Sequence, residues 1–354
     1  MAYNKFLNPM TEEQYRKEQN IQALQRHFVE SGRTAPFERG VARIALTEGC
    51  NFYCKFCHNE GMSGITKQFD LKQLDTILGA YKDKIKSIKL VGGEPLLHRQ
   101  FDKVVEICQK VAPTSVTTNG SMLQKWMQSL VKLEGVTVSV HSLMNERYQD
   151  IMGTSSNVEE VVAGISELIA AGVNVHINCV LTRENQDEAE RIIERFAQIG
   201  VSEIKFLEIL KVKEEDGDLY FPLAELTERL KKKYGEPKVA GSTKMAFPVN
   251  EKTSALLVYQ YCSVGCNVCR VEGFLRIDPE PALSYCLAAE PVSIGEEASK
   301  GDVEGLKAKF ELAMNGMGKP TGYTYSVKGR KRPNLVQIRQ FQADNKAQEV
   351  QAGL

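Results

Sequence analysis

Six short β-branched runs alternate with helix-like patterns between residues 41 and 209, and this alternation constrains the fold more than any other feature. The runs are VARIAL (41–46), SIKLVG (87–92), TSVTT (114–118), VTVSV (136–140), VNVHINCVL (173–181) and EIKFLEI (203–209). Helical patterns span about 70–84, 100–112, 121–132, 157–171 and 184–199. Strands separated by helices are typical of parallel βα units. Six units are fewer than the eight of a closed barrel, so we expect an α/β fold with a partial (β/α)6 TIM-type barrel.

The chemically unusual residues follow these strands. A cysteine-rich loop follows the first run, GGEP (92–95) the second, Asn119 the third and His141 the fourth, while Asn178 and Glu208 lie in or at the end of the last two. Parallel strands place their carboxyl ends at one edge, where barrel enzymes carry their functional loops. The sequence therefore predicts one functional rim.

Nine cysteines form two groups and two isolated positions. The first group is Cys50, Cys54 and Cys57, the second is Cys262, Cys266, Cys269 and Cys286, and Cys108 and Cys179 stand alone. The first group has C-x3-C-x2-C spacing, and three thiolates in one loop can bind three irons of a [4Fe–4S] cluster while leaving the fourth iron open. Tetrahedral zinc, with His58 or a distant residue as the fourth ligand, is the alternative that spacing leaves open. The two isolated cysteines fit buried packing positions.

The chain of 354 residues is too long for one ordinary compact domain. We divide it into an N-terminal helical leader (1–38), the barrel (39–225), a smaller C-terminal iron–sulfur domain around the second cysteine group (226–325) and a polar, basic tail (326–354). Turn-rich composition makes the stretch 211–255 an expected irregular connection.

The charge balance excludes one class of partner. Lys+Arg and Asp+Glu are both 45, so the formal net charge is zero and a bulk nucleic-acid binder is not expected. No apolar run reaches the roughly 18 residues that span a membrane, and the N-terminus lacks the apolar stretch of a signal peptide. We expect a cytoplasmic protein without membrane contact, as a monomer or homodimer.

The first cysteine loop, followed 35 residues later by Gly-Gly-Glu-Pro, resembles the radical S-adenosylmethionine (SAM) superfamily. The resemblance implies a [4Fe–4S] cluster on Cys50, Cys54 and Cys57, with SAM bound to the open iron. An electron from a reducing partner such as flavodoxin or ferredoxin would then release a 5′-deoxyadenosyl radical that removes hydrogen from a substrate. The SAM-contacting positions that it implies are Gly92, Gly93, Glu94, Thr118, Ser139 and Leu210. For Thr118 and Ser139 the alternative is a backbone cap.

From about residue 39 to 338 the sequence resembles the GTP 3′,8-cyclases of molybdenum-cofactor synthesis. The shared segments are RIALT (43–47), LVGGEPLLHR (90–99), SVTTNG (115–120), SVHSL (139–143) and KFLEIL (205–210). This resemblance implies a second [4Fe–4S] cluster in the C-terminal domain and cations in the barrel mouth that hold a triphosphate. Arg43 matches one of these arginines and is the candidate catalytic and phosphate-binding residue; its alternative is a salt bridge at the rim.

The second cysteine group departs from the cyclase pattern. Cys266, Cys269 and Cys286 align with the three cysteines of that family's second cluster, which leaves Cys262 extra. If Cys262 is also a ligand, the auxiliary cluster is fully coordinated and cannot hold a purine on iron. A structural zinc is the alternative for this group.

The expected substrate site also differs. His98 and His176 stand where the cyclases have arginine and lysine, and Lys205 replaces an arginine. Imidazoles are charged only conditionally near pH 7, so we expect a less cationic mouth than a triphosphate needs. The cyclases end in a Gly-Gly tail that the polar residues 339–354 replace here. These differences indicate a divergent relative.

The sequence therefore predicts a radical SAM enzyme that cyclises or rearranges a nucleotide or nucleoside-like small molecule. One alternative is a peptide-modifying radical SAM enzyme whose recognition domain comes from another protein. A second is the GTP cyclase itself, and a third is a non-catalytic iron–sulfur or zinc protein.

Overall fold

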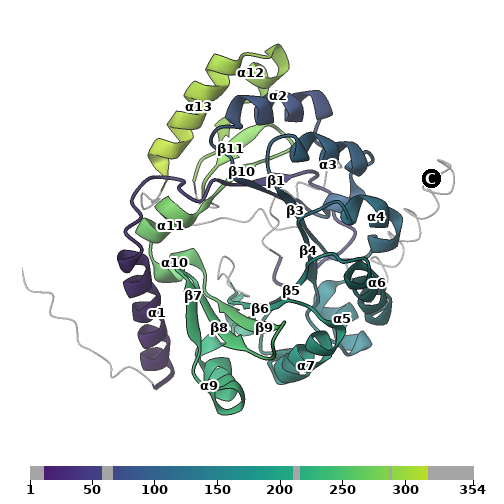
Figure 1. Cartoon of the computed structure of the whole chain (residues 1–354), viewed down its shortest axis with the longest axis vertical. Helices are drawn as coiled ribbons and strands as arrows, with labels where there is room; N and C mark the ends of the chain where they lie inside the picture. The colour runs from purple at the N-terminus through teal and green to yellow at the C-terminus, as the bar shows by residue number, and fades with distance from the viewer. Residues whose placement is uncertain (1–11, 58–66, 210–215, 287–288, 318–354) are drawn as a thin grey trace, which may run out of the picture.

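The structure is a computed structural model that describes residues 12–57, 67–209, 216–286 and 289–317 (Figure 1). The predictions for His58, Leu210 and the tail 326–354 lie outside these residues. Every strand of the described chain belongs to one 12-stranded sheet, in the order β12-β11-β10-β1-β2-β3-β4-β5-β6-β9-β8-β7.

The six predicted strands form the centre of this sheet. They are β1 (Val41–Ala45), β2 (Ser87–Val91), β3 (Thr114–Thr118), β4 (Gly135–Ser139), β5 (Val175–Val180) and β6 (Glu203–Leu207). All neighbouring pairs among them are parallel. The sheet curves without closing, which confirms the predicted partial barrel (Figure 1).

Six further strands extend the sheet at both ends. They are β7 (Lys238–Gly241), β8 (Lys244–Pro248), β9 (Ser254–Val258), β10 (Phe274–Ile277), β11 (Ala282–Ser284) and β12 (Val292–Ser293). β9 pairs parallel with β6, and β10 pairs parallel with β1. The expectation of an irregular stretch 211–255 is therefore wrong, because β7 to β9 are short strands interrupted by tight turns. The chain beyond residue 225 continues the barrel sheet.

Helices cover the outer face of the sheet (Figure 1). The helices of the described chain are α1 (Glu12–Glu30), α2 (Leu71–Tyr81), α3 (Phe101–Gln109), α4 (Leu123–Leu130), α5 (Asn145–Met152), α6 (Val158–Ala170), α7 (Ala189–Ile199), α8 (Asp216–Leu219), α9 (Leu223–Tyr234), α10 (Tyr261–Val264), α11 (Cys266–Glu272), α12 (Gly295–Lys300) and α13 (Val303–Gly316), with 3₁₀ turns at Pro95–Leu97 and Gln186–Glu188. Asp70 and Asn157 cap α2 and α6 by accepting hydrogen bonds from the backbone N–H groups of Gln73 and Glu159. Gly200 ends α7 in the left-handed conformation, as its position predicts.

The two faces of the sheet differ in polarity. On β1, Ala42 and Ile44 are fully buried in the core beneath the helices. Because side chains alternate along a strand, Arg43 projects to the opposite, inner face. Arg43 is in register with Lys89 on one side and with Arg276 on the other, so all three share that face. The interior of the partial barrel is thus polar and charged.

The cysteine-bearing helices α10 and α11 connect β9 to β10 across the open side of the barrel (Figure 1). Helix α1 packs on α9, α10 and β7 there, with Ile21, Leu24 and Phe28 buried. The Lys17 ammonium of α1 donates to Glu208 at 2.6 Å and to the Tyr220 hydroxyl at 3.0 Å. Burial lowers the pKa of Lys17, but these hydrogen bonds outweigh it, so the pKa is raised.

The substitution Lys17→Met tests this anchor. It leaves the buried Glu208 carboxylate without this cation, so we expect a loss of about 1–2 kcal/mol in the free energy of unfolding. Lys103→Met is the matched control, because the Lys103–Glu106 pair is half-exposed on both sides, and it should change stability by less than about 0.5 kcal/mol. Urea unfolding of both variants measures the difference; equal effects would show that α1 is not anchored through Lys17.

Candidate functional site

The first cysteine loop and the ends of β2, β3 and β4 enclose one cavity of about 210 Å³. Its lining comprises Arg43, Cys50, Phe52, Cys54, Phe56, Cys57, Val91, Gly92, Gly93, Glu94, Thr117, Thr118, Asn119, Ser139, His141 and Met152. The structure thus brings together the three cysteines, Arg43 and every described residue for which a SAM contact was expected. Of the functional rim inferred from strand order, the residues after β1 to β4 line this cavity, whereas Asn178 and Glu208 do not.

Helix α5, which the sequence pattern did not reveal, fixes the cysteine loop. The backbone N–H of Tyr53 donates to Met152 O at 3.0 Å, and that of Lys55 donates to Ile151 O at 3.0 Å. The Lys55 ammonium also pairs with Asp150 at 2.5 Å. Cys50, Cys54 and Cys57 are therefore carried by a loop whose backbone is tied to a helix.

Two glycines allow the loop to lie directly against the end of β2. Gly93 N–H donates to Thr47 O at 2.8 Å, and Glu94 N–H donates to Gly49 O at 2.8 Å. A Cβ on Gly93 would lie 2.1 Å from Gly49 O, and one on Gly92, whose φ is +148°, would lie 2.6 Å from Thr47 O. These glycines permit a backbone-to-backbone contact that any side chain would prevent.

Glu94 organises the floor of the cavity. Its buried carboxylate accepts hydrogen bonds from the Thr118 hydroxyl at 2.7 Å, from Asn119 N–H at 2.7 Å and from Leu96 N–H at 3.0 Å. Burial raises the pKa of Glu94 to about 7, against the opposing effect of these hydrogen bonds. The Thr118 hydroxyl also accepts from Gly120 N–H at 3.0 Å, so Thr118 serves as a backbone cap as well as lining the cavity.

Of two further polar residues of the cavity, the sequence did not indicate Thr117 and gave no role to His141. The Thr117 hydroxyl is buried and has no hydrogen-bond partner among the described residues. His141 is buried, and its Nδ1 accepts from Val180 N–H at 2.9 Å, which leaves the proton on Nε2. Burial lowers the pKa of His141 to about 3, so the ring is neutral. The sequence places His141 directly after a strand. The face of the sheet on which Thr117 lies follows only from the strand pairing.

The donors and the cavity fit an iron–sulfur cluster with an adjacent organic ligand. Three thiols border the cavity together with an unpartnered hydroxyl and a glycine-lined wall. No three of the described His, Cys, Asp or Glu side chains are already drawn together as a closed metal site. Burial, followed by the charge of Glu94, raises the pKa of the Cys50 thiol, so a bound metal must supply the free energy of its deprotonation.

The four cysteines of the second group lie near one another, although no three of these described side chains are drawn together as a metal site. Cys262 lies on α10, Cys266 and Cys269 lie on α11, and Cys286 follows β11. Burial raises the pKa of Cys269 to about 12, with further contributions from Cys286, Cys262 and Cys266. Burial, followed by the charges of Cys286 and Cys266, likewise raises the pKa of the Cys262 thiol. The extra cysteine is therefore a neighbour of the other three.

The expected substrate residues separate into two places. His176 on β5 accepts a hydrogen bond from the Lys205 ammonium at 3.0 Å, and burial and then Lys205 lower its pKa to about 4. Lys205 also pairs with Glu203 at 2.8 Å. His98 is buried elsewhere and does not line the cavity. Its Nε2 lies 3.1 Å from Phe69 O, and its Nδ1 accepts a hydrogen bond from Gln100 N–H at 3.2 Å.

Cations that the sequence did not single out join Lys205 on the inner face. Burial lowers the pKa of Lys89 to about 7, and Lys205, Arg43, Lys244 and Arg39 contribute in that order. Lys89 makes no ion pair with a described residue. The charges that act on Lys89 are therefore mainly positive, although the formal net charge of the whole chain is zero.

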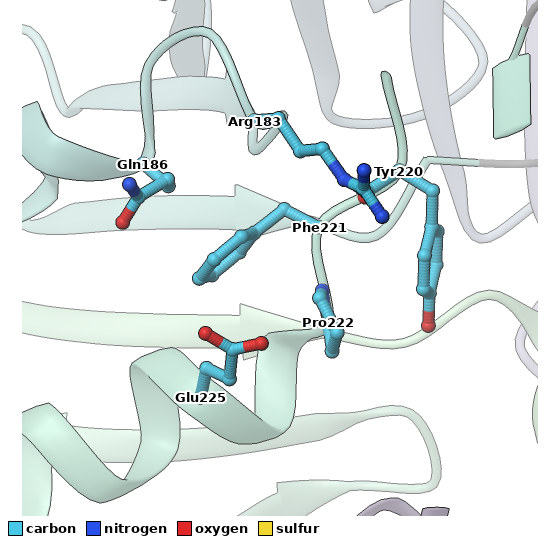
Figure 2. Close-up of a pocket in the computed structure, with 6 residues that line it drawn as sticks. All are labelled: Arg183, Gln186, Tyr220, Phe221, Pro222 and Glu225. Atoms are coloured by element: carbon cyan, nitrogen blue, oxygen red, sulfur yellow. The ribbon is translucent and has the colours of Figure 1, made fainter. Parts of the chain in front are cut away.

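A second pocket, of about 300 Å³, lies beside the β5–α7 connection and the start of α9 (Figure 2). Figure 2 shows Arg183 next to Tyr220, and the Phe221 ring between Gln186 and Glu225. Arg183 Nε donates to Tyr220 O at 3.0 Å, and Gln186 Oε1 accepts from Arg229 at 2.7 Å. This pocket shares no residue with the cysteine cavity, and two of its polar groups already have partners.

Comparisons with known proteins agree with this site. A model of the radical SAM superfamily matches residues 44–196. The chain is 33% identical over 267 residues to a Saccharolobus islandicus protein named probable GTP 3′,8-cyclase, which covers 70% of this chain and 82% of the relative. A Metallosphaera sedula protein of the same name is 34% identical over 178 residues, 47% of this chain and 55% of the relative.

Solved structures show the same fold. Streptococcus suis SuiB bound to S-adenosylmethionine superposes with a TM-score of 0.58 at 15% identity, covering 84% of this chain and 72% of SuiB. The structure of anSMEcpe with bound AdoMet superposes with a TM-score of 0.54 at 14% identity, covering 79% of this chain and 81% of anSMEcpe.

The chain belongs to the radical SAM superfamily of enzymes, which use a [4Fe–4S] cluster and SAM. Within that superfamily it is a divergent relative of the proteins named probable GTP 3′,8-cyclase. No described helix has the length and apolarity needed to cross a membrane.

The substitution Gly93→Ala tests the backbone contact beneath the cavity. The added methyl would meet Gly49 O at 2.1 Å, so we expect a loss of about 1–3 kcal/mol in stability and a lower iron content after reconstitution. Gly79→Ala is the control, because Gly79 is exposed in α2 with nothing within 4 Å of its Cβ position; it should stabilise by about 0.5–1 kcal/mol. Normal iron content and stability in the Gly93 variant would contradict the contact.

Proposed function

We propose that this enzyme acts on a phosphorylated small molecule of the nucleotide or nucleoside type. The observation that carries the proposal is the cationic inner face. There the charges of Lys205 and Arg43, on two other strands, lower the pKa of Lys89. Like charges held together in a partly buried site are costly unless an anion binds between them. Phosphate is the anion that such clusters of arginine and lysine recognise best.

Arg43 connects this cation cluster to the reacting cavity. It lies on the inner face in register with Lys89, and it also lines the cavity that holds Cys50, Cys54 and Cys57. Its guanidinium lies 4.6 Å from the centre of the Phe274 ring, which fixes its direction. A substrate whose phosphate lies on Arg43 and Lys89 would present its remainder to the cysteine cavity.

Cys50, Cys54 and Cys57 would hold the first cluster, with SAM beside it against Gly92, Gly93, Glu94, Thr118 and Ser139. When bound, these groups supply the 5′-deoxyadenosyl radical that abstracts hydrogen. The protein's own part is to orient the substrate and to exclude water. The neutral His141 and the Thr117 hydroxyl offer hydrogen bonds at the cavity wall.

The substrate proposal is tested by 5′-deoxyadenosine release with a panel of nucleosides, their mono-, di- and triphosphates and short peptides. We expect phosphorylated nucleosides to stimulate release above the uncoupled background. Lys89→Met should raise the KM for them roughly ten- to hundred-fold, because a hydrogen bond to a charged group contributes about 1.5–3 kcal/mol. Lys82→Met, an exposed lysine outside the barrel interior, is the control and should leave KM unchanged.

The pH dependence gives a second result in the same assay. Anion binding needs protonated Lys89, whose pKa of about 7 rises when an anion binds. Affinity should therefore fall as the pH rises above 7, by up to about ten-fold per unit, and Lys89→Met should flatten this slope. Stimulation by peptides alone, or a KM that Lys89→Met leaves unchanged, would contradict the proposal.

A peptide-modifying enzyme is the second candidate. Its support is the likeness to SuiB, one structure of which is described as bound to the precursor peptide SuiA, with a TM-score of 0.55 at 14% identity. That identity supports the fold alone. Titration with a leader peptide separates the candidates, since a peptide enzyme would bind it whatever residue stands at position 89. The cyclase reaction of the relatives is a third candidate, and complementation of a cyclase-deficient strain tests it.

We further propose that Cys262, Cys266, Cys269 and Cys286 all ligate an auxiliary [4Fe–4S] cluster, with zinc as the alternative metal. The support is the mutual influence of the four thiols. Four thiolates complete a cluster and leave no iron open to substrate. None of the nine cysteines forms a disulfide, which suits a reducing cytoplasm. The electron donor that we propose there is a flavodoxin or ferredoxin.

Cys262→Ala tests the fourth ligand. If Cys262 ligates, the variant should lose iron from the auxiliary site or show a changed EPR signal for that cluster. Cys108→Ala is the control, because Cys108 is buried away from both groups and should retain the full iron content. An unchanged iron count and signal in the Cys262 variant would show that three cysteines are sufficient.

A further inference from the structure

A polar cavity of about 240 Å³ lies between the end of α1, the loop before β1, the β7–β8 turn and the end of α11. We call it the seam pocket. Its lining comprises His27, Ser31, Arg33, Arg39, Ala240, Gly241, Ser242, Thr243, Lys244 and Glu272. These residues come from the end of α1 and the loop after it, the β7–β8 turn and the end of α11. None of them lines the cysteine cavity.

The β7–β8 turn presents an unsatisfied hydroxyl. Gly241 pairs with Lys244 across the turn, which leaves Ser242 and Thr243 at its tip. The Ser242 side chain is 1% exposed, and its hydroxyl has no hydrogen-bond partner among the described residues. Tyr259 N–H donates to Thr243 O at 2.8 Å and ties the turn to β9. A buried, unpaired hydroxyl on a fixed turn is costly unless a ligand accepts or donates there.

The charges around Ser242 are mostly positive. The lining carries three cationic side chains, Arg33, Arg39 and Lys244, against the single carboxylate of Glu272. Arg33 pairs with Glu272 at 2.7 Å, which neutralises that carboxylate. Arg39 uses one guanidinium nitrogen for the Tyr261 hydroxyl, at 3.0 Å, and for Glu272 O, at 3.4 Å. An arginine has five N–H donors, so donors of Arg39 remain for a ligand.

Lys244 lacks an ionic partner in the part of the chain that the structure describes. It is half-buried, and burial, Lys205 and Arg39 lower its pKa while Glu203 and Glu272 oppose them. A half-buried ammonium beside two other cations is stabilised by an anion between them. Among the described residues, Lys244 thus lacks a counter-ion and Ser242 lacks a hydrogen-bond partner. The two residues are two positions apart on one turn, so a single anion would serve both.

We propose that the seam pocket is a phosphate-binding site in which Lys244, Arg39 and the Ser242 hydroxyl hold a tetrahedral oxyanion. Phosphate suits it because donors come from the β7–β8 turn on one side and from the loop before β1 on the other, and a tetrahedral group offers acceptors in all these directions. The cavity is large enough for a phosphate and the first atoms of an ester. Bound there, the anion would join the β7–β8 turn to the loop before β1.

Two sources can supply this group: free phosphate, or a phosphate carried by a larger molecule such as the substrate. Lys244 on β8 and Lys205 on β6 flank β9 and their charges interact, so the seam pocket lies near the inner face. The inference itself concerns the pocket and does not depend on the reaction.

The test is a calorimetric titration of the reconstituted, full-length protein with inorganic phosphate, at constant ionic strength in chloride. We expect saturable binding that Lys244→Met weakens at least ten-fold and Ser242→Ala weakens about three- to ten-fold. Lys238→Met, an exposed lysine on the same hairpin outside the pocket, is the matched control and should bind as the unsubstituted protein does. Ser242→Ala should fold normally without phosphate, because it removes an unpaired buried hydroxyl.

The outcomes distinguish free phosphate from the phosphate of a larger molecule. They also distinguish failure of the phosphate site from failure of the proposed reaction. Phosphate that competes with a nucleoside triphosphate indicates a phosphate of the larger molecule, and simultaneous binding indicates free phosphate; both support the site. No binding above the chloride background, or binding that neither Ser242→Ala nor Lys244→Met weakens, would overturn it. Binding that Lys89→Met abolishes but Ser242→Ala does not would also overturn it, by placing the phosphate in the barrel interior. Loss of substrate turnover without loss of phosphate binding concerns the proposed reaction alone.

Discussion

The parallel pairing of neighbouring strands is the constraint on which the rest of this molecule depends. From β10 through β1 to β6 and β9, every neighbouring pair runs in the same direction. Parallel pairing collects the loops after β1 to β4 at one edge, where the cysteines and the GGEP segment form one cavity. It also requires β9 and β10 to be joined across the open side, and the second cysteine group lies on that connection. Both cysteine groups are thus positioned by one sheet.

The same pairing determines the electrostatics of the interior. Residues in register on parallel strands share a face, which brings Arg43 beside Lys89 and Arg276. Lys205 reaches the same interior, although Glu203 and His176 are its direct partners. A chain with zero net charge can therefore gather cations on the inner face of its sheet, where Glu203 pairs with Lys205 and Asp278 with Arg276.

The sequence was sufficient for the six central strands, for the partial barrel and for the first cysteine cavity, because short apolar runs and cysteine spacing are local signals. It was not sufficient for β7 to β9, whose strands are short and broken by turns, nor for α5, whose apolar pattern is weak. The role of Thr117 and the cation cluster around Lys89 depend on strand register, which no local pattern reveals. His98 was expected near substrate, yet both of its ring nitrogens serve nearby backbone.

The most direct measurement of the central claim is the iron and sulfide content of the anaerobically reconstituted protein, compared with a variant in which Cys50, Cys54 and Cys57 are alanine. The account predicts about eight irons in the unsubstituted protein and about four in the variant, with the SAM-dependent release of 5′-deoxyadenosine lost. About four irons in the unsubstituted protein would contradict the second cluster. An iron content that the triple substitution leaves unchanged would contradict the first.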